Sequence, residues 1–139
     1  MSTHATISIY KENGTVCSIY NHTCGAPSEL GIMLKKHYNS EALAMELISM
    51  GDASYVGSRI HPKNPETHSF SSPEPDVCLF YSRDRKEDDC EMKEFNSIEE
   101  ANSNSIEPYH YLFKDNRWYL IKEDVNYKCS LVDLDEVIE

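Results

Sequence analysis

Apolar and polar residues alternate at the start of the chain. Ile7 has polar neighbours on both sides, and the apolar positions resume at Val16 and Ile19 after the segment Glu-Asn-Gly-Thr. A period of two is typical of a half-buried strand, and Asn13-Gly14 supplies the positive φ angles of a tight turn. The pattern predicts an antiparallel β-hairpin.

Two segments with helical spacing follow. Apolar residues within 30–38 fall on one face, and Pro27 suits the first turn, where its missing N–H would have no partner. A second apolar stripe lies between Ser40, which is suited to cap a helix, and Gly51, which is suited to end one. We expect two helices that form a bent pair on one face of a sheet.

Proline punctuates the middle of the chain. Four of the six prolines lie between Gly51 and Asp76, which predicts a long loop over residues 52–76. The sequence DVCLFYSRDR then predicts a strand over residues 76–83. The charged residues 84–94 predict an exposed turn or an extension of that strand.

The last third of the chain returns to strand patterns. Residues 97–100, SIEE, match a capping box and predict a short helix. PYHYLFKDNRWYLI predicts a second hairpin with its turn at Asp115-Asn116. Residues 129–132 fit both a strand and helical spacing. We favour a short strand followed by a helical turn that begins near Asp133.

These elements predict a fold class. Their order is β-β-α-α-β-α-β-β with a short final element, in a single domain over residues 1–139. We expect an α+β fold, with a mainly antiparallel sheet of roughly four to six strands and two to three helices packed on one face.

The charge of the chain limits its partners. Its formal net charge is −11, which disfavours direct binding to nucleic acid because phosphate contacts need lysine and arginine. A solvated acidic surface and an imitation of DNA charge both stay open as interpretations. No apolar run approaches the roughly 20 residues that span a membrane, and no basic leader precedes an apolar stretch. We expect a cytoplasmic protein.

Five cysteines occur, an odd number, without a CxxC pair. This disfavours a disulfide framework and a structural zinc site, and we expect no metal or other cofactor. Two alternatives stay open. Cys24 precedes a predicted helix whose dipole would lower its thiol pKa and make it a nucleophile. A metal site is the other alternative, with ligands among His22, Cys24, His61, His68 and Cys90.

Several segments resemble one family. The opening of the chain resembles that of small bacteriophage and prophage accessory proteins, in the segments MSTHATISIY and GTVCSIYNH and in the helix that follows. That family typically begins with Met-Ser-Thr-Arg, a strand, Asp-Gly, and a second strand that ends in Ile-Tyr-x-His. HSFSSPEPDVCLFYSRDR resembles the middle of that family, with His-Ser-Phe and Arg-Asp-Arg, and YHYLFKDNRWYLI its late hairpin. Here His4 replaces the usual arginine, and Thr23 to Pro27 replace Trp-Asp-Gly-Tyr-Pro. The resemblance implies a phage protein that acts in the infected bacterial cytoplasm, and it carries no reaction with it.

The Arg-Asp-Arg segment is the strongest candidate for binding chemistry. If the strand continues through it, Arg83 and Arg85 project from the same face and hold phosphate or carboxylate with two parallel forks. His22 would end the second strand beside the site, and His68 would close over it from the loop. The predicted ligand-binding set is therefore Arg83, Arg85, His22, His68, Tyr20 and Tyr81. Alternatively, the two arginines only neutralise the acidic residues that follow them.

Aromatic residues suggest a different function. The late hairpin contains Tyr109, Tyr111 and Tyr119. If these side chains are half exposed, they are suited to form the core of a protein interface, and if they are buried, they pack the helices onto the sheet. An exposed sheet edge would also permit self-association into a homo-oligomer. We expect an accessory protein that modulates host or defence processes by non-enzymatic binding to a host bacterial protein. The alternatives are capture of a small anionic ligand such as a nucleotide signal, and hydrolysis of such a ligand.

Overall fold

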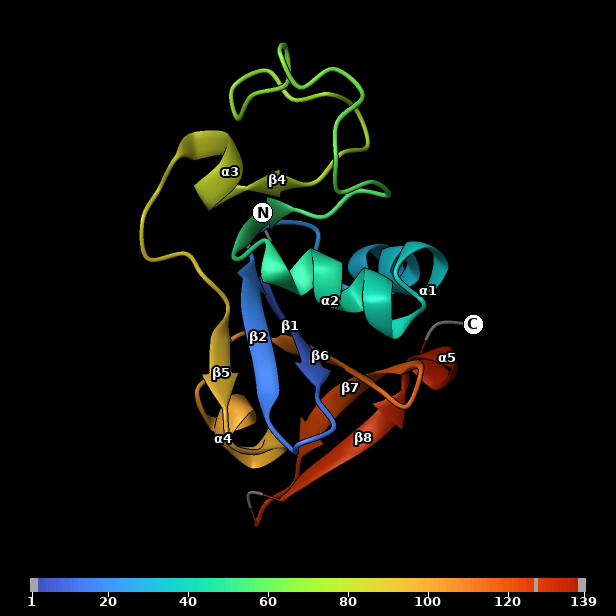
Figure 1. The fold of residues 1–139 in the computed structure, drawn as a ribbon. Helices are drawn as coiled ribbons and strands as arrows, with labels where there is room; N and C mark the ends of the chain where they lie inside the picture. The colour runs from blue at the N-terminus through green and yellow to red at the C-terminus, as the bar shows by residue number, and fades with distance from the viewer. Residues whose placement is uncertain (1–2, 127, 138–139) are drawn as a thin grey trace.

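The computed structural model describes residues 3–126 and 128–137. Within these residues the chain forms one sheet of eight strands, five α-helices and a π-helical turn (Figure 1). The strands are β1 (Ala5–Tyr10), β2 (Val16–Asn21), β3 (Ala53–Tyr55), β4 (Leu79–Phe80), β5 (Lys93–Phe95), β6 (Tyr109–Lys114), β7 (Arg117–Glu123) and β8 (Cys129–Asp133). The helical elements are η1 (Pro27–Gly31), α1 (Ile32–His37), α2 (Glu41–Ser49), α3 (Tyr81–Arg85), α4 (Ile98–Ser103) and α5 (Leu134–Val137).

The sheet is mixed. Its strand order is β4-β3-β2-β1-β6-β7-β8, and β5 pairs with β2 beside this path. The pairs β1–β6 and β2–β3 are parallel, and the other five pairs are antiparallel. The predicted α+β class is confirmed, but the sheet has more strands than expected. The two strands that were not predicted, β3 and β5, contain three residues each, too few to show a period of two.

Both predicted hairpins are present. In the first, Ile7 lies opposite Ile19, and Gly14 has a φ of +88°. Asn13 does not share this positive φ. Its side chain instead accepts hydrogen bonds from the amide and the hydroxyl of Thr15. The connection between the end of β1 at Tyr10 and the start of β2 at Val16 is longer than the tight turn that was expected. The second hairpin joins β6 to β7 through the turn at Asp115-Asn116, as predicted.

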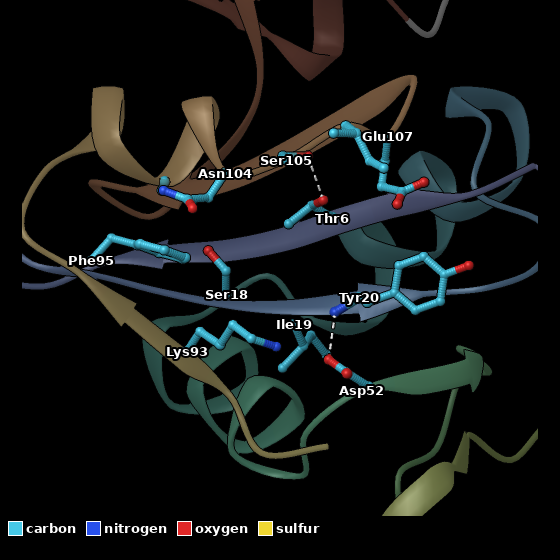
Figure 2. Close-up of a pocket in the computed structure, with 12 residues that line it drawn as sticks. Thr6, Ser18, Ile19, Tyr20, Asp52, Lys93, Phe95, Asn104, Ser105 and Glu107 are labelled. Carbon is cyan, nitrogen blue, oxygen red and sulfur yellow. Dashed lines mark hydrogen bonds between the residues drawn. The ribbon is translucent and has the colours of Figure 1, made fainter. Parts of the chain in front are cut away.

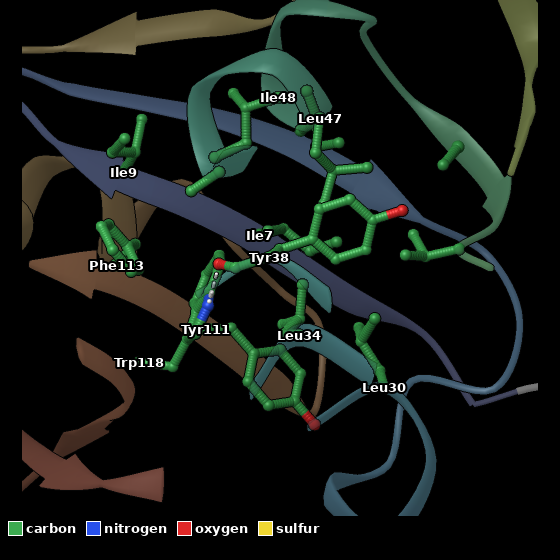
Figure 3. Close-up of a cluster of buried hydrophobic side chains, with 14 of the residues drawn as sticks. Ile7, Ile9, Leu30, Leu34, Tyr38, Leu47, Ile48, Tyr111, Phe113 and Trp118 are labelled. Atoms are coloured by element: carbon green, nitrogen blue, oxygen red, sulfur yellow. Dashed lines mark hydrogen bonds between the residues drawn. The ribbon is translucent and has the colours of Figure 1, made fainter. Parts of the chain in front are cut away.

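The larger core lies between the sheet and the pair α1 and α2. Pro27 begins the first helical segment, and Ser40 caps α2 by accepting a hydrogen bond from the Leu43 amide. Figure 3 shows Trp118 donating its indole N–H to the Tyr38 carbonyl at 2.8 Å inside this core. Strand positions that face the core are buried and apolar because the sheet alternates its faces.

Helices cover both faces of the sheet, so the expectation of helices on one face is wrong. Ala101 of α4 packs on the opposite face against Val16, Leu112 and Ile121. Ser97 caps this helix by accepting a hydrogen bond from the Glu100 amide, as the capping box predicts. The helix is short, and the polar side chains of Thr6 and Ser18 lie beside it on this face.

The strand predicted over residues 76–83 is also wrong beyond Phe80. The chain turns there into α3, and the carboxylate of Asp84 accepts a hydrogen bond from the Phe80 amide at 2.9 Å. That side-chain contact satisfies the amide at the helix start, where no backbone partner exists. At the other end of the chain, the predicted strand over 129–132 is confirmed in β8, and α5 follows it.

Residues 57–76 form an irregular arm that projects beyond β4 and α3 (Figure 1). The long loop predicted over residues 52–76 is thus present in its larger part, but Ala53–Tyr55 within it form β3. The side chains of His68 and Phe70 in this arm pack against α3. Across the part of the chain that is described, no helix has the length and apolar character to cross a lipid bilayer.

Candidate functional site

A pocket of about 240 Å³ lies on the sheet face opposite α1 and α2. It sits over the polar ends of β1 and β2, between β5 and the segment that follows α4 (Figure 2). We call it the sheet-face pocket. Its lining includes Thr6, Ser18, Tyr20, Asp52, Lys93, Phe95, Asn104, Ser105, Ile106 and Glu107.

The pocket is acidic. Asp52 accepts a hydrogen bond from the Tyr20 amide at 2.9 Å. Burial raises the pKa of the Asp52 carboxyl, and this amide and the charge of Lys93 offset only part of that rise. Burial also raises the pKa of the Tyr20 hydroxyl, and the negative charges of Glu107 and Asp52 add to that shift. The acidic character of the pocket comes from its lining, in which the carboxylates of Asp52 and Glu107 face the single ammonium group of Lys93.

A row of hydroxyl groups runs under the pocket floor. The hydroxyl oxygens of Ser18 and Ser8, which are cross-strand partners, lie 2.5 Å apart. Ser8 also bonds His110 Nε2 at 2.7 Å, and His110 Nδ1 lies 3.3 Å from Asn102 Oδ1. Because an amide oxygen only accepts, Nδ1 carries the imidazole proton. Burial lowers the pKa of His110 to about 4, so the ring is neutral and acts as a fixed part of the sheet.

Two imidazoles flank Tyr20 at the pocket end of β1 and β2. His4 Nδ1 donates to the His22 carbonyl at 2.7 Å, and the two rings lie 4.6 Å apart. The Tyr20 hydroxyl lies 2.7 Å from His22 Nδ1 and 3.0 Å from His4 Nδ1. Since His4 Nδ1 is the donor to a carbonyl, Tyr20 donates its own proton to His22. The cluster fixes the position of Tyr20 at the pocket wall.

The His-Ser-Phe and Arg-Asp-Arg segments pack against each other. His68 Nε2 lies 3.4 Å from Asp84 Oδ1, and both side chains are buried. Phe70 stacks on Tyr81 with centroids 5.6 Å apart, and the Arg85 guanidinium lies 5.2 Å from the Phe70 ring. We call these five residues the clasp. It fastens the proline-rich arm to α3.

Arg83 ties the arm to the sheet. Its guanidinium donates to the carbonyls of Ile60 at 2.6 Å and Cys78 at 2.9 Å, and to both carboxylate oxygens of Asp84. Burial alone would raise the pKa of Asp84, but the hydrogen bonds from Arg83 and the Phe80 amide outweigh it and hold that pKa below its usual range. Four of the five guanidinium N–H groups are therefore already used within the protein.

The six residues of the predicted ligand-binding set fall into three places. Arg83 and His68 line one hollow of about 450 Å³ between the arm and α3, which we call the loop hollow. Arg85 and Tyr81 belong to the clasp, and Arg85 also pairs with Glu87 at 3.4 Å. Tyr20 lines the sheet-face pocket, and His22 contacts the Tyr20 hydroxyl without lining the pocket. The expected pair of parallel guanidinium forks is not observed, because α3 replaces the strand that would have aligned them.

Sequence analysis did not identify Asp52, Lys93, Ile106 or Glu107 as site residues. They come from three separate segments that the sheet brings together, and no local motif marks them. The pairing of β2 with β5 places Lys93 directly opposite Ser18, which is a consequence of tertiary structure.

The pKa of the Cys24 thiol shifts in the direction opposite to the one expected for a nucleophile. Its pKa is raised, first by a hydrogen bond with Glu29 and then by burial and the charge of that carboxylate, whereas a helix dipole was expected to lower it. Cys24 has a φ of +57°. In residues 3–126 and 128–137, no three His, Cys, Asp or Glu side chains gather as metal ligands, and the five cysteines are free thiols.

The three tyrosines considered for an interface differ in how far they are buried. Tyr111 is buried and donates its hydroxyl proton to the Gly25 carbonyl at 2.7 Å. Tyr109 and Tyr119 are half-buried on their strands. The exposed large apolar side chains lie elsewhere, and Ile106 at the sheet-face pocket is one of them.

Comparison of the chain with protein-family models, with curated protein sequences and with solved structures finds no match.

Proposed function

We propose that this chain is a phage accessory protein that acts in the infected bacterial cytoplasm by binding a host protein without catalysis. The sheet-face pocket and its rim are the proposed docking surface. The resemblance of several segments to phage accessory proteins motivates the phage context, and the geometry of the pocket motivates the choice of surface.

One observation carries the choice of surface. Ile106 is 93% exposed at the pocket rim, and the next residue is the carboxylate-bearing Glu107. A partner seated on the pocket would cover Ile106 and remove its apolar side chain from water, which favours binding. The pocket beside it offers Asp52 at depth and aromatic walls from Tyr20 and Phe95.

The charge supports a basic partner. The sheet-face pocket has two carboxylates against one lysine, and the whole chain has a net charge of −11. Such a surface attracts a positively charged protein and accelerates its encounter, an effect that salt weakens. We expect the partner to present a lysine or arginine side chain to the pocket and an apolar patch to Ile106.

The test compares two equally exposed aliphatic residues. Tagged wild-type protein, Ile106→Asp and Val125→Asp are expressed in host cells and used to capture partners, and Val125 is also 93% exposed but lies outside the pocket lining. We expect one host protein to be retained by the wild type and by Val125→Asp and lost by Ile106→Asp. With that protein purified, its affinity should fall as salt rises. Equal retention by both variants would contradict the proposed surface.

A further inference from the structure

The loop hollow differs from its neighbours in charge. Arg83 and Lys86 line it against a single carboxylate, Asp84. Four other hollows formed by the described residues are lined by as many acidic as basic residues, or by more acidic ones. In a strongly acidic chain, this excess of positive charge is a local feature that favours an anion.

The single carboxylate is already compensated. Asp84 is buried and accepts two hydrogen bonds from Arg83, so these two charges form an internal pair. Lys86 is exposed, and among the described residues no carboxylate lies within ion-pair distance of its ammonium group. The positive charge available to a ligand is therefore that of Lys86.

Two further donors line the same hollow. One N–H of Arg83 is left after its four internal hydrogen bonds. The Ser69 hydroxyl accepts from the Ser72 amide at 3.1 Å, and its oxygen lies 3.5 Å from that of Ser71. When the Ser71 hydroxyl donates in this contact, Ser69 keeps its own proton for a ligand. An ammonium, a guanidinium N–H and a hydroxyl together match the several acceptor oxygens of a phosphate group.

We propose that the loop hollow binds a small ligand that bears a phosphate group, with Lys86 as its charge partner and Arg83 and Ser69 as hydrogen-bond donors. This site is separate from the docking surface proposed above. Its volume of about 450 Å³ lies in the range of small-molecule sites and accommodates a pyrophosphate or a mononucleotide. The arm that forms one wall is held in place by the clasp, so the hollow exists before the ligand arrives.

The test uses pyrophosphate and AMP as probes in calorimetric titration and thermal-shift assays. Both should bind the wild type and raise its Tm, because a ligand that binds only the folded state stabilises it. Pyrophosphate alone would identify a polyphosphate site, and tighter binding of AMP would show that the base or ribose also makes contacts.

The matched variants are Lys86→Glu and Lys36→Glu. Both reverse the charge of an exposed lysine, and Lys36 lies on α1 outside the hollow lining. We expect Lys86→Glu to weaken binding at least about tenfold and Lys36→Glu to leave it within about twofold. Circular dichroism confirms that both variants fold. The proposal would be overturned if neither pyrophosphate nor AMP binds the wild type at about 10 mM, or if the two variants lose affinity equally.

Discussion

Acidification should destabilise the protein through His110. The imidazole is buried in the row of hydroxyl groups beneath the sheet-face pocket, and burial lowers its pKa from 6.5 to about 4. Between these two values the unfolded chain binds a proton at this position and the folded chain does not. Stability contributed by the neutral ring is therefore complete above about pH 6.5 and declines as the pH falls toward 4.

The magnitude follows from the size of the shift. A difference of about 2.5 pKa units corresponds to roughly 3 kcal/mol at about 1.4 kcal/mol per unit, and most of it is lost by about pH 4.5. Asp84 and Asp133 have lowered pKa values, so the stability they contribute is lost only at still lower pH, below about 4. Burial raises the pKa of Asp52, so its contribution to stability grows as the pH falls, but it does so alike in the wild type and in a variant that lacks His110. The difference between those two proteins therefore reports on His110.

The assay is urea unfolding of the wild type and His110→Gln at about pH 7, 6, 5 and 4.5. His110→Gln removes the titrating ring. Between about pH 7 and 4.5 the free energy of unfolding of the wild type should therefore fall by roughly 2 to 3 kcal/mol more than that of His110→Gln. His37→Gln is the control, because His37 is exposed on α1. Parallel pH profiles for the wild type and His110→Gln would refute the assignment of a neutral, buried imidazole.

Two other substitutions test the core and the clasp. Trp118→Phe removes the donor to the buried Tyr38 carbonyl and should lower the free energy of unfolding by about 1–3 kcal/mol in urea titrations. Asp84→Asn should leave Arg83 unpaired and loosen the arm, so limited proteolysis within residues 57–76 should be several-fold faster than in the exposed control Asp88→Asn. Unchanged cleavage of that arm in Asp84→Asn would show that the clasp does not restrain it.

Local sequence signals predicted much of the fold. The hairpins follow from alternating side chains and turn residues, because both features act within a few residues. Ser40 and Ser97 mark helix starts for the same reason, since a cap bonds an amide only three residues away. These elements appear in the structure where the sequence placed them.

The remaining features depend on contacts between distant segments. α3 forms because Asp84 satisfies the Phe80 amide and Arg83 reaches the carbonyls of Ile60 and Cys78, which no pattern in residues 76–85 reveals. The predicted arginine pair failed for that reason. The sheet-face pocket likewise gathers residues from β2, β5 and the segment after α4, and the turn that places Ile106 at its rim has no sequence signature.

The docking surface is tested most directly by site-specific photo-crosslinking in host cells. A photoreactive phenylalanine analogue replaces Ile106 in one protein and Val125 in another, and both positions are 93% exposed. The proposed function predicts one covalent adduct with a basic host protein at position 106 and little or none at position 125. No adduct at position 106, or the same adduct in equal yield at both positions, would contradict it.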